Sequence, residues 1–233
     1  MTTISANLQA VNQRIAMASS AAGRAAAAVH LLAVSKTQSA AAVLAAALAG
    51  QQAFGENYVQ EGVEKITALQ QSRPQLALNW HFIGPLQSNK TRLVAEHFDW
   101  VHTIDRLKIA QRLAEQRPAQ LPPLQVCVQV NVSGEESKSG CPPAEAAALC
   151  RAVLALPHLQ LRGLMAIPAP ADNLAAQRAP CRQLYQLYQQ LKADGLPLDT
   201  LSMGMSHDLE AAIAEGATLV RVGTAIFGER IHP

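Results

Sequence analysis

The stretch His30-Leu31-Leu32-Ala33-Val34-Ser35-Lys36-Thr37 decides how the rest of the chain is interpreted. Its first six residues are mostly apolar and contain no Gly or Pro, which predicts a short strand buried on both faces. Lys36 comes where this strand gives way to a loop. Desolvation at such a position lowers the pKa of a lysine and frees its amine to attack a carbonyl, which is Schiff-base chemistry. The alternative, from this stretch alone, is a solvated lysine that begins the next helix.

The strand-like pattern recurs along the whole chain. Helical segments rich in Ala, Leu and Gln separate the strand candidates, and one further helix opens the chain with apolar positions at Ile4, Leu8, Val11 and Ile15. Each crossover is long enough to return the next strand parallel to the last. The eight strand candidates are residues 31–35, 52–55, 80–84, 100–104, 124–132, 161–167, 200–205 and 219–226.

Eight β-then-α units predict a closed (β/α)8 barrel more economically than an open doubly wound sheet. No G-x-G-x-x-G motif follows the first strand, which counts against a dinucleotide-binding fold. We expect one domain over residues 1–233, because the last strand candidate ends shortly before Pro233. The expected fold class is therefore α/β, a single TIM barrel with an extra N-terminal helix.

Composition excludes several classes of function. The chain has 233 residues, a net charge of +2, 15% charged residues and 4% aromatic residues, so it offers neither a basic stripe nor a stacking surface for nucleic acid. The N-terminal residues lack the pattern of a signal peptide, and no apolar run is long enough to span a membrane. We expect a cytoplasmic protein with no membrane partner.

The four cysteines do not predict a metal site or a disulfide. Cys127, Cys141, Cys150 and Cys181 form no C-x-x-C pair and no cluster with histidine. We interpret them as reduced structural thiols, and we expect no metal.

Two segments near the ends of the seventh and eighth strands have the composition of a phosphate site. Ser206 precedes an acidic helix start, so its hydroxyl either holds an anion or simply caps the helix. In Arg221-Val222-Gly223-Thr224, glycine permits close backbone approach, threonine offers a hydroxyl, and alternation points Arg221 the same way as Gly223. An arginine directed into a barrel mouth needs an acceptor; the alternative is an ion pair on the rim. A reactive amine, a phosphate cradle and an inward arginine together suit pyridoxal 5′-phosphate (PLP).

Five segments carry a resemblance to a known family. They are residues 33–37 (AVSKT), 54–58 (FGENY), 81–90 (HFIGPLQSNK), 201–206 (LSMGMS) and 220–228 (VRVGTAIFG). They closely resemble the pyridoxal phosphate homeostasis proteins, and the resemblance spans nearly the whole chain. It implies a single barrel similar to the N-terminal domain of alanine racemase, and PLP bound as a covalent aldimine on Lys36.

The resemblance also implies roles for the other cofactor-binding residues. Ser206, Gly223 and Thr224 match positions that hold the phosphate, and Arg221 matches the arginine that faces the pyridine nitrogen. Three more residues are expected to line the pocket, namely Asn57, His81 and Met203. Many family members follow the Ser-Lys-Thr sequence with a second lysine and a proline, where this chain has Gln38-Ser39, so any role for a second amine there is in doubt.

Three further features leave alternatives open. The segment from Gly84 to Thr91 is one residue away from the phosphate-loop pattern G-x-x-x-x-G-K-[ST], but Asn89 replaces the second glycine, so we interpret Asn89 and Lys90 as a helix start instead. Lys138 is either a solvated loop charge or a second acceptor of the cofactor aldehyde. His81 and His207 are each either polar pocket groups or packing and capping residues.

Two functions compete for this site. The resemblance implies a non-catalytic protein of intracellular PLP homeostasis, and the alternative is a PLP-dependent, racemase-like enzyme acting on amino acids. An arginine beside the pyridine nitrogen disfavours its protonation and weakens the electron sink that catalysis needs. We also see no second domain like the one that completes the racemase site. We therefore expect a monomer that binds PLP without robust turnover, with apo PLP-dependent enzymes as partners; the sequence does not decide between delivery, buffering and sensing.

Overall fold

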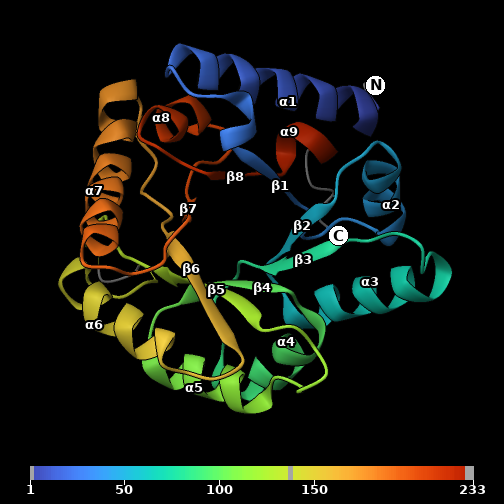
Figure 1. Cartoon of the computed structure of the whole chain (residues 1–233). Helices are drawn as coiled ribbons and strands as arrows, with labels where there is room; N and C mark the ends of the chain where they lie inside the picture. The colour runs from blue at the N-terminus through green and yellow to red at the C-terminus, as the bar shows by residue number, and fades with distance from the viewer. Residues whose placement is uncertain (1–2, 136–138, 229–233) are drawn as a thin grey trace.

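The computed structural model describes residues 3–135 and 139–228, and within them the strands close into one parallel barrel (Figure 1). Each strand pairs with its sequence neighbours, and the first pairs with the eighth. The predicted α/β barrel is confirmed. The strands are β1 (His30–Val34), β2 (Ala53–Glu56), β3 (Asn79–Phe82), β4 (Trp100–Ile104), β5 (Leu124–Gln129), β6 (Leu159–Met165), β7 (Thr200–Ser202) and β8 (Leu219–Val222).

Helices surround the barrel and cover its outer face (Figure 1). The predicted extra helix is α1, which packs against α8 and α9 on the side where the barrel closes. Two short 3-10 helices, η1 (Ala26–Ala28) and η2 (Ser88–Lys90), precede β1 and α4. The α-helices are α1 (Ile4–Ala21), α2 (Ala40–Leu48), α3 (Val59–Ser72), α4 (Thr91–His97), α5 (Leu107–Gln116), α6 (Pro143–Leu154), α7 (Leu174–Ala193), α8 (Leu209–Ala214) and α9 (Thr224–Phe227).

Strand β1 has both faces buried, as its apolar sequence predicts. Ala33 belongs to the large core between the sheet and the helices, whereas Leu32 packs with Ile83 and Leu219 in a smaller cluster. Successive strand residues point to opposite faces, so the smaller cluster lies inside the barrel and the larger one outside it. The residues at the end of each strand therefore form the rim of the barrel.

Three predicted strands are shorter by three or more residues in the structure than in the sequence analysis. The eighth was predicted to reach residue 226 but ends at Val222, because the amides of Ile226 and Phe227 donate to the Gly223 carbonyl, at 2.8 and 3.0 Å, and begin α9. The seventh ends at Ser202 rather than at residue 205, before the left-handed Gly204 (φ 94°). The fifth ends at Gln129, short of the predicted residue 132.

The phosphate-loop-like segment has a structural explanation. A Cβ atom added to Gly84 would lie 2.1 Å from the Asn57 carbonyl oxygen, so glycine allows two rim loops to meet there. Asn89 and Lys90 lie in η2, which runs directly into α4, as the helix-start interpretation predicted.

The remaining composition-based expectations concern helices and cysteines. Among the described residues, no helix has both the length and the apolar character needed to cross a membrane. Cys127, Cys141, Cys150 and Cys181 are buried and unpaired. Burial raises the pKa of each thiol, for Cys141 to about 11 and for Cys150 and Cys181 to about 12. These cysteines therefore remain protonated and pack as small apolar side chains.

Candidate cofactor site

A cavity of about 250 Å³ opens at the carboxyl ends of the strands, where (β/α)8 barrels carry their functional sites. It brings together six of the eight residues singled out from the sequence, which come from the ends of β1, β2, β7 and β8. His207 from the loop after β7 adds a polar group, and Val34, Ile83, Ile167 and Met205 supply an apolar wall. The six are Lys36, Asn57, Ser206, Arg221, Gly223 and Thr224.

His81 and Met203 do not line this cavity. His81 lies in the middle of β3 and Met203 directly follows β7, and both are buried. His81 instead reaches a second cavity at the opposite mouth of the barrel. The family resemblance placed both residues near the cofactor. The position of a residue along its strand decides its depth in the barrel, and His81 lies below the rim.

The strand-end lysine, Lys36, belongs to a turn that buried polar side chains hold in place. The Ser35 hydroxyl donates to Glu56 Oε1 at 2.6 Å, and Lys65 Nζ donates to the Ser35 carbonyl at 2.6 Å. Lys65 also forms an ion pair with Glu56 at 2.9 Å. Burial raises the pKa of Glu56, and the neighbouring Lys65 and Ser35 oppose that shift. These buried contacts hold the backbone of the turn that carries Lys36.

The residue after the lysine has an unusual backbone conformation. Thr37 has φ 64°, which a β-branched residue rarely adopts. Its amide donates to Glu61 Oε1 at 2.6 Å, and the same oxygen lies 2.6 Å from Lys65 Nζ. Strained backbone of this kind persists where surrounding contacts enforce it, and it is common at functional sites.

Ser206 does not cap α8, because Asp208 is the residue before the helix and accepts from the Met205 amide at 2.6 Å. The capping alternative for Ser206 is therefore wrong, and Ser206 lines the cavity. The Ser206 carbonyl accepts from Arg14 Nη1 of α1 at 2.9 Å, and Arg14 also forms an ion pair with Glu210. The extra N-terminal helix thus holds the loop that carries Ser206.

A second contact from α1 holds α9, the helix that follows β8. Asn7 Nδ2 donates to the Ile226 carbonyl of α9 at 2.8 Å. Gly223 packs closely on β1, since an added Cβ atom would lie 3.0 Å from the Val34 carbonyl oxygen. Gly223 and Thr224, where β8 gives way to α9, both line the cavity.

Arg221 is buried and points along the barrel interior. It is 4% exposed, its Nη1 donates to Ser202 Oγ at 2.8 Å, and its Nη2 donates to the Ala166 carbonyl at 2.8 Å. Burial lowers the pKa of Arg221 to about 10, so the guanidinium is still protonated at neutral pH. In residues 3–135 and 139–228 it forms no ion pair with a carboxylate, which excludes the rim ion pair there.

The chemistry of these donors fits PLP. The cavity offers a primary amine, two hydroxyls, a helix start and a guanidinium, which match an aldehyde, a phosphate and a ring nitrogen. In addition, Asn57 Oδ1 is buried without a hydrogen-bond partner. An unsatisfied buried polar atom beside a cavity indicates that a bound molecule supplies its partner.

Comparison with known proteins supports the same reading. The family model described as alanine racemase, N-terminal domain, matches residues 6–231. A pyridoxal phosphate homeostasis protein of Pseudomonas aeruginosa is 62% identical over 230 residues, which cover 99% of this chain and 97% of the relative. One of Vibrio cholerae is 59% identical over 230 residues, covering 99% and 98%. The chain belongs to the pyridoxal phosphate homeostasis proteins.

A solved structure similar to this chain contains PLP. PipY of Synechococcus elongatus, solved with PLP bound, is 40% identical to this chain with a TM-score of 0.80, and the match covers 92% of this chain and 100% of PipY. The family resemblance predicted from five short segments is thus confirmed over nearly the full length of the chain.

The sequence analysis missed the residues that support the site from outside it. Glu56 and Lys65 are nine residues apart across a loop and a helix, and Arg14 is 192 residues from Ser206. Glu56 lies inside the 54–58 motif, so its burial at a strand end was a usable signal. Arg14 gave none, because an arginine on an amphipathic helix usually faces solvent.

Proposed function

We propose that this protein binds PLP in the cavity at the carboxyl ends of the strands and serves its homeostasis in the cytoplasm, without robust turnover of amino acids. The observation that carries the proposal is the convergence of Lys36, Arg221, Ser206 and Thr224 on one small cavity. Family membership and the PLP-bound relative support it. We further propose that the protein acts as a monomer and exchanges PLP with apo PLP-dependent enzymes.

Each residue has a distinct role in this proposal. When bound, PLP supplies an aldehyde that forms a Schiff base with an amine. Lys36 provides that amine, on a turn held by Glu56 and Lys65. Ser206 and Thr224 hold the phosphate with their hydroxyls, and Arg221 donates towards the ring nitrogen. The Asn57 amide completes the site as a hydrogen-bonding group on the β2 side.

The arrangement is poorly equipped for reactions at an α-carbon. Such reactions need a protonated ring nitrogen as an electron sink and acid or base groups on both faces of the substrate. Arg221 is a donor held in place by Ser202 and Ala166, so it does not deliver a proton to the ring. Among the described residues that line the cavity, His207 is the remaining candidate for a second acid or base.

The first prediction tests turnover directly. Wild-type protein loaded with PLP should exchange the α-proton of alanine or serine in deuterated water far more slowly than enzymes turn over, which is on the order of 1 per second or faster. Proton NMR with stoichiometric protein measures the rate. Exchange at enzymatic rates that is lost in His207→Gln would establish the racemase-like alternative, with His207 as the second acid or base.

The second prediction concerns the phosphate. Ser206→Ala and Thr224→Val should each weaken PLP binding by about 1–3 kcal/mol, the range for a hydrogen bond to a charged group. Equilibrium titration monitored by visible absorbance gives both affinities, and unphosphorylated pyridoxal should bind wild-type protein far more weakly. Ser88→Ala, which alters a serine in η2 away from the cavity, is the matched control. If the double variant kept wild-type affinity, these hydroxyls would not hold the phosphate.

A further inference from the structure

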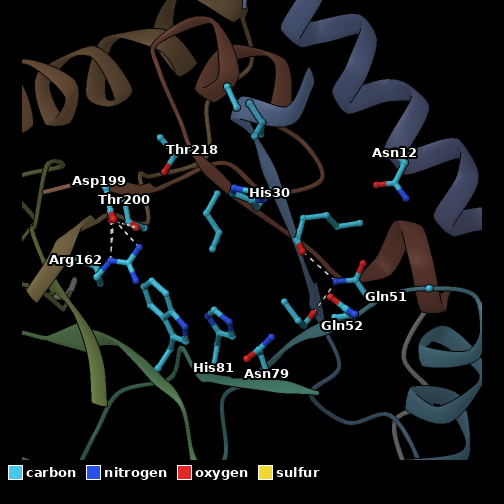
Figure 2. Close-up of a pocket in the computed structure, with 17 residues that line it drawn as sticks. Asn12, His30, Gln51, Gln52, Asn79, His81, Arg162, Asp199, Thr200 and Thr218 are labelled. Carbon is cyan, nitrogen blue, oxygen red and sulfur yellow. Dashed lines mark hydrogen bonds and ion pairs between the residues drawn. The ribbon is translucent and has the colours of Figure 1, made fainter. Parts of the chain in front are cut away.

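The barrel has a second, larger cavity at the amino ends of its strands. Its volume is about 740 Å³, and its lining includes residues of β1, β2, β3, β4, β6, β7 and β8 and of the segments that precede several of them. Figure 2 shows His81 beside Asn79 at one edge of this cavity, with the ion pair of Arg162 and Asp199 on another side. His81 is 4% exposed, and its ring stacks on Trp100 with centroids 5.1 Å apart.

A chain of hydrogen bonds runs from this second cavity to the cofactor site. His81 Nδ1 lies 2.9 Å from His102 Nε2, and His102 Nδ1 lies 2.9 Å from Ser202 Oγ. Ser202 Oγ in turn accepts from Arg221 Nη1 at 2.8 Å. The four side chains come from β3, β4, β7 and β8, and all are at most 4% exposed. The chain therefore crosses the barrel interior from one mouth to the other.

Arg221 fixes the direction of every hydrogen in this chain. An arginine only donates, so Ser202 Oγ must accept from it, and the Ser202 hydroxyl hydrogen needs an acceptor of its own. His102 Nδ1 is the acceptor within reach among the described residues, which leaves the His102 proton on Nε2, donated to His81 Nδ1. The His81 proton is then on Nε2, on the side of the ring away from His102.

Both histidines must be neutral for this pattern to hold. A doubly protonated ring donates from both nitrogens, so His102 could no longer accept from Ser202, or His81 from His102. Burial lowers the pKa of His81 to about 3. Burial lowers the pKa of His102 well below its usual value, and the charge of Arg221 and the neighbouring His81 add to that shift. The hydrogen-bond chain that contacts the charged Arg221 guanidinium is therefore itself uncharged.

We infer that Ser202 and His102 are positioning residues of the cofactor site, which hold the Arg221 guanidinium in one orientation through a one-directional hydrogen-bond chain that ends at His81. The inference rests on the proposed function, because it takes the target of Arg221 to be the ring nitrogen of PLP. In this arrangement, the Ser202 oxygen accepts from Arg221 only while His102 Nδ1 accepts the hydrogen of the Ser202 hydroxyl.

The first arm of the test needs no cofactor. Long-range nitrogen–proton NMR of the full chain labelled with ¹⁵N-histidine distinguishes the two neutral tautomers, and His81→Phe and His102→Asn assign the two signals. Both histidines should be neutral Nε2–H tautomers and should stay so through the pH range near 6.5 in which exposed histidines titrate. An Nδ1–H tautomer at His102, or titration of either residue near 6.5, would overturn the inference.

The second arm measures positioning. Ser202→Ala and His102→Leu should each weaken PLP binding roughly 10-fold or more, as expected for loss of a hydrogen bond to a charged group. His102→Asn keeps an acceptor near the Nδ1 position and should bind within a few-fold of wild type. Thr200→Val removes a hydroxyl from the same strand, outside the chain, and is the matched control.

A purely structural role would give a different pattern. If His102→Asn lost as much affinity as His102→Leu, or if Ser202→Ala bound PLP like wild type, the positioning role would be refuted. The ¹⁵N shift of labelled PLP should also move in Ser202→Ala, since the ring nitrogen would lose its oriented donor. If both histidines of the wild-type protein were Nε2–H tautomers but the protein did not bind PLP, the proposed function and the positioning role would both be overturned. The hydrogen-bond chain itself would still be established.

Discussion

Replacing Lys36 by alanine should abolish covalent capture of PLP. Lys36 lies at the end of β1 and lines the cavity that also contains Ser206, Thr224 and Arg221. Among the described lysines it alone does so. Lys65, which contacts the turn that carries Lys36, is 6% exposed and is bound to Glu56, Glu61 and the Ser35 carbonyl. An amine engaged in this way is not available to attack an aldehyde.

The measurement is borohydride reduction followed by peptide mass spectrometry. Wild-type protein should carry one reduced PLP adduct, on the peptide that contains Lys36, and the variant should carry none there. Lys108→Ala, which alters an exposed lysine of α5, should leave the adduct unchanged. An adduct of wild-type yield elsewhere in Lys36→Ala would show that another lysine is the anchor. Lys138, which lies outside the described residues, would be examined first.

Replacing Lys65 by methionine should destabilise the protein by about 3–5 kcal/mol, the cost of removing one partner of a buried ion pair. The Glu56 side chain has no exposed surface, and one of its oxygens, Oε2, already lacks a hydrogen-bond partner. Without Lys65, the other oxygen would keep only the Ser35 hydroxyl. The loss of charge compensation and of the bond to the Ser35 carbonyl should also loosen the turn that carries Lys36.

Chemical denaturation of the PLP-free protein measures this effect. Lys108→Met, at an exposed position, should change the free energy of unfolding by no more than about 0.5 kcal/mol. Adding Glu56→Gln to Lys65→Met should recover part of the loss, because most of it comes from an uncompensated buried charge. A loss below 1 kcal/mol in Lys65→Met would mean that the ion pair contributes little and that Lys36 is held by other contacts.

The sequence predicted the order of the strands and helices better than the side-chain contacts inside the barrel. Short apolar runs separated by helical segments are local signals, so all eight strands and the strand-end placement of Lys36 could be predicted. Strand ends were less certain, because Gly223 starts a helix through hydrogen bonds that the residue pattern does not reveal. Ser206, Thr224 and Arg221 could be predicted to lie at one mouth, because the rim loops meet there in any such barrel, and all three line one cavity.

The cross-barrel contacts could not be predicted. His102 and Ser202 are 100 residues apart in sequence and meet only because β4 and β7 face each other across the interior. A histidine in an apolar strand shows neither its depth in the barrel nor its partner. The family resemblance grouped His81 with the pocket residues, yet the structure connects it to the pocket through two intervening side chains.

The pairing of β1 with β8 has a consequence for biosynthesis. His30 to Ala33 align with Leu219 to Val222, so the first strand made by the ribosome acquires its second neighbour from the last. Lys36 comes from one side of this seam, and Arg221 and Thr224 come from the other. Pairing between such distant segments requires closure of a very long loop, which makes it a late event in folding. On the proposed function, a partly translated chain would present Lys36 without Arg221 and Thr224, so we expect stable PLP binding only after β8 has paired with β1.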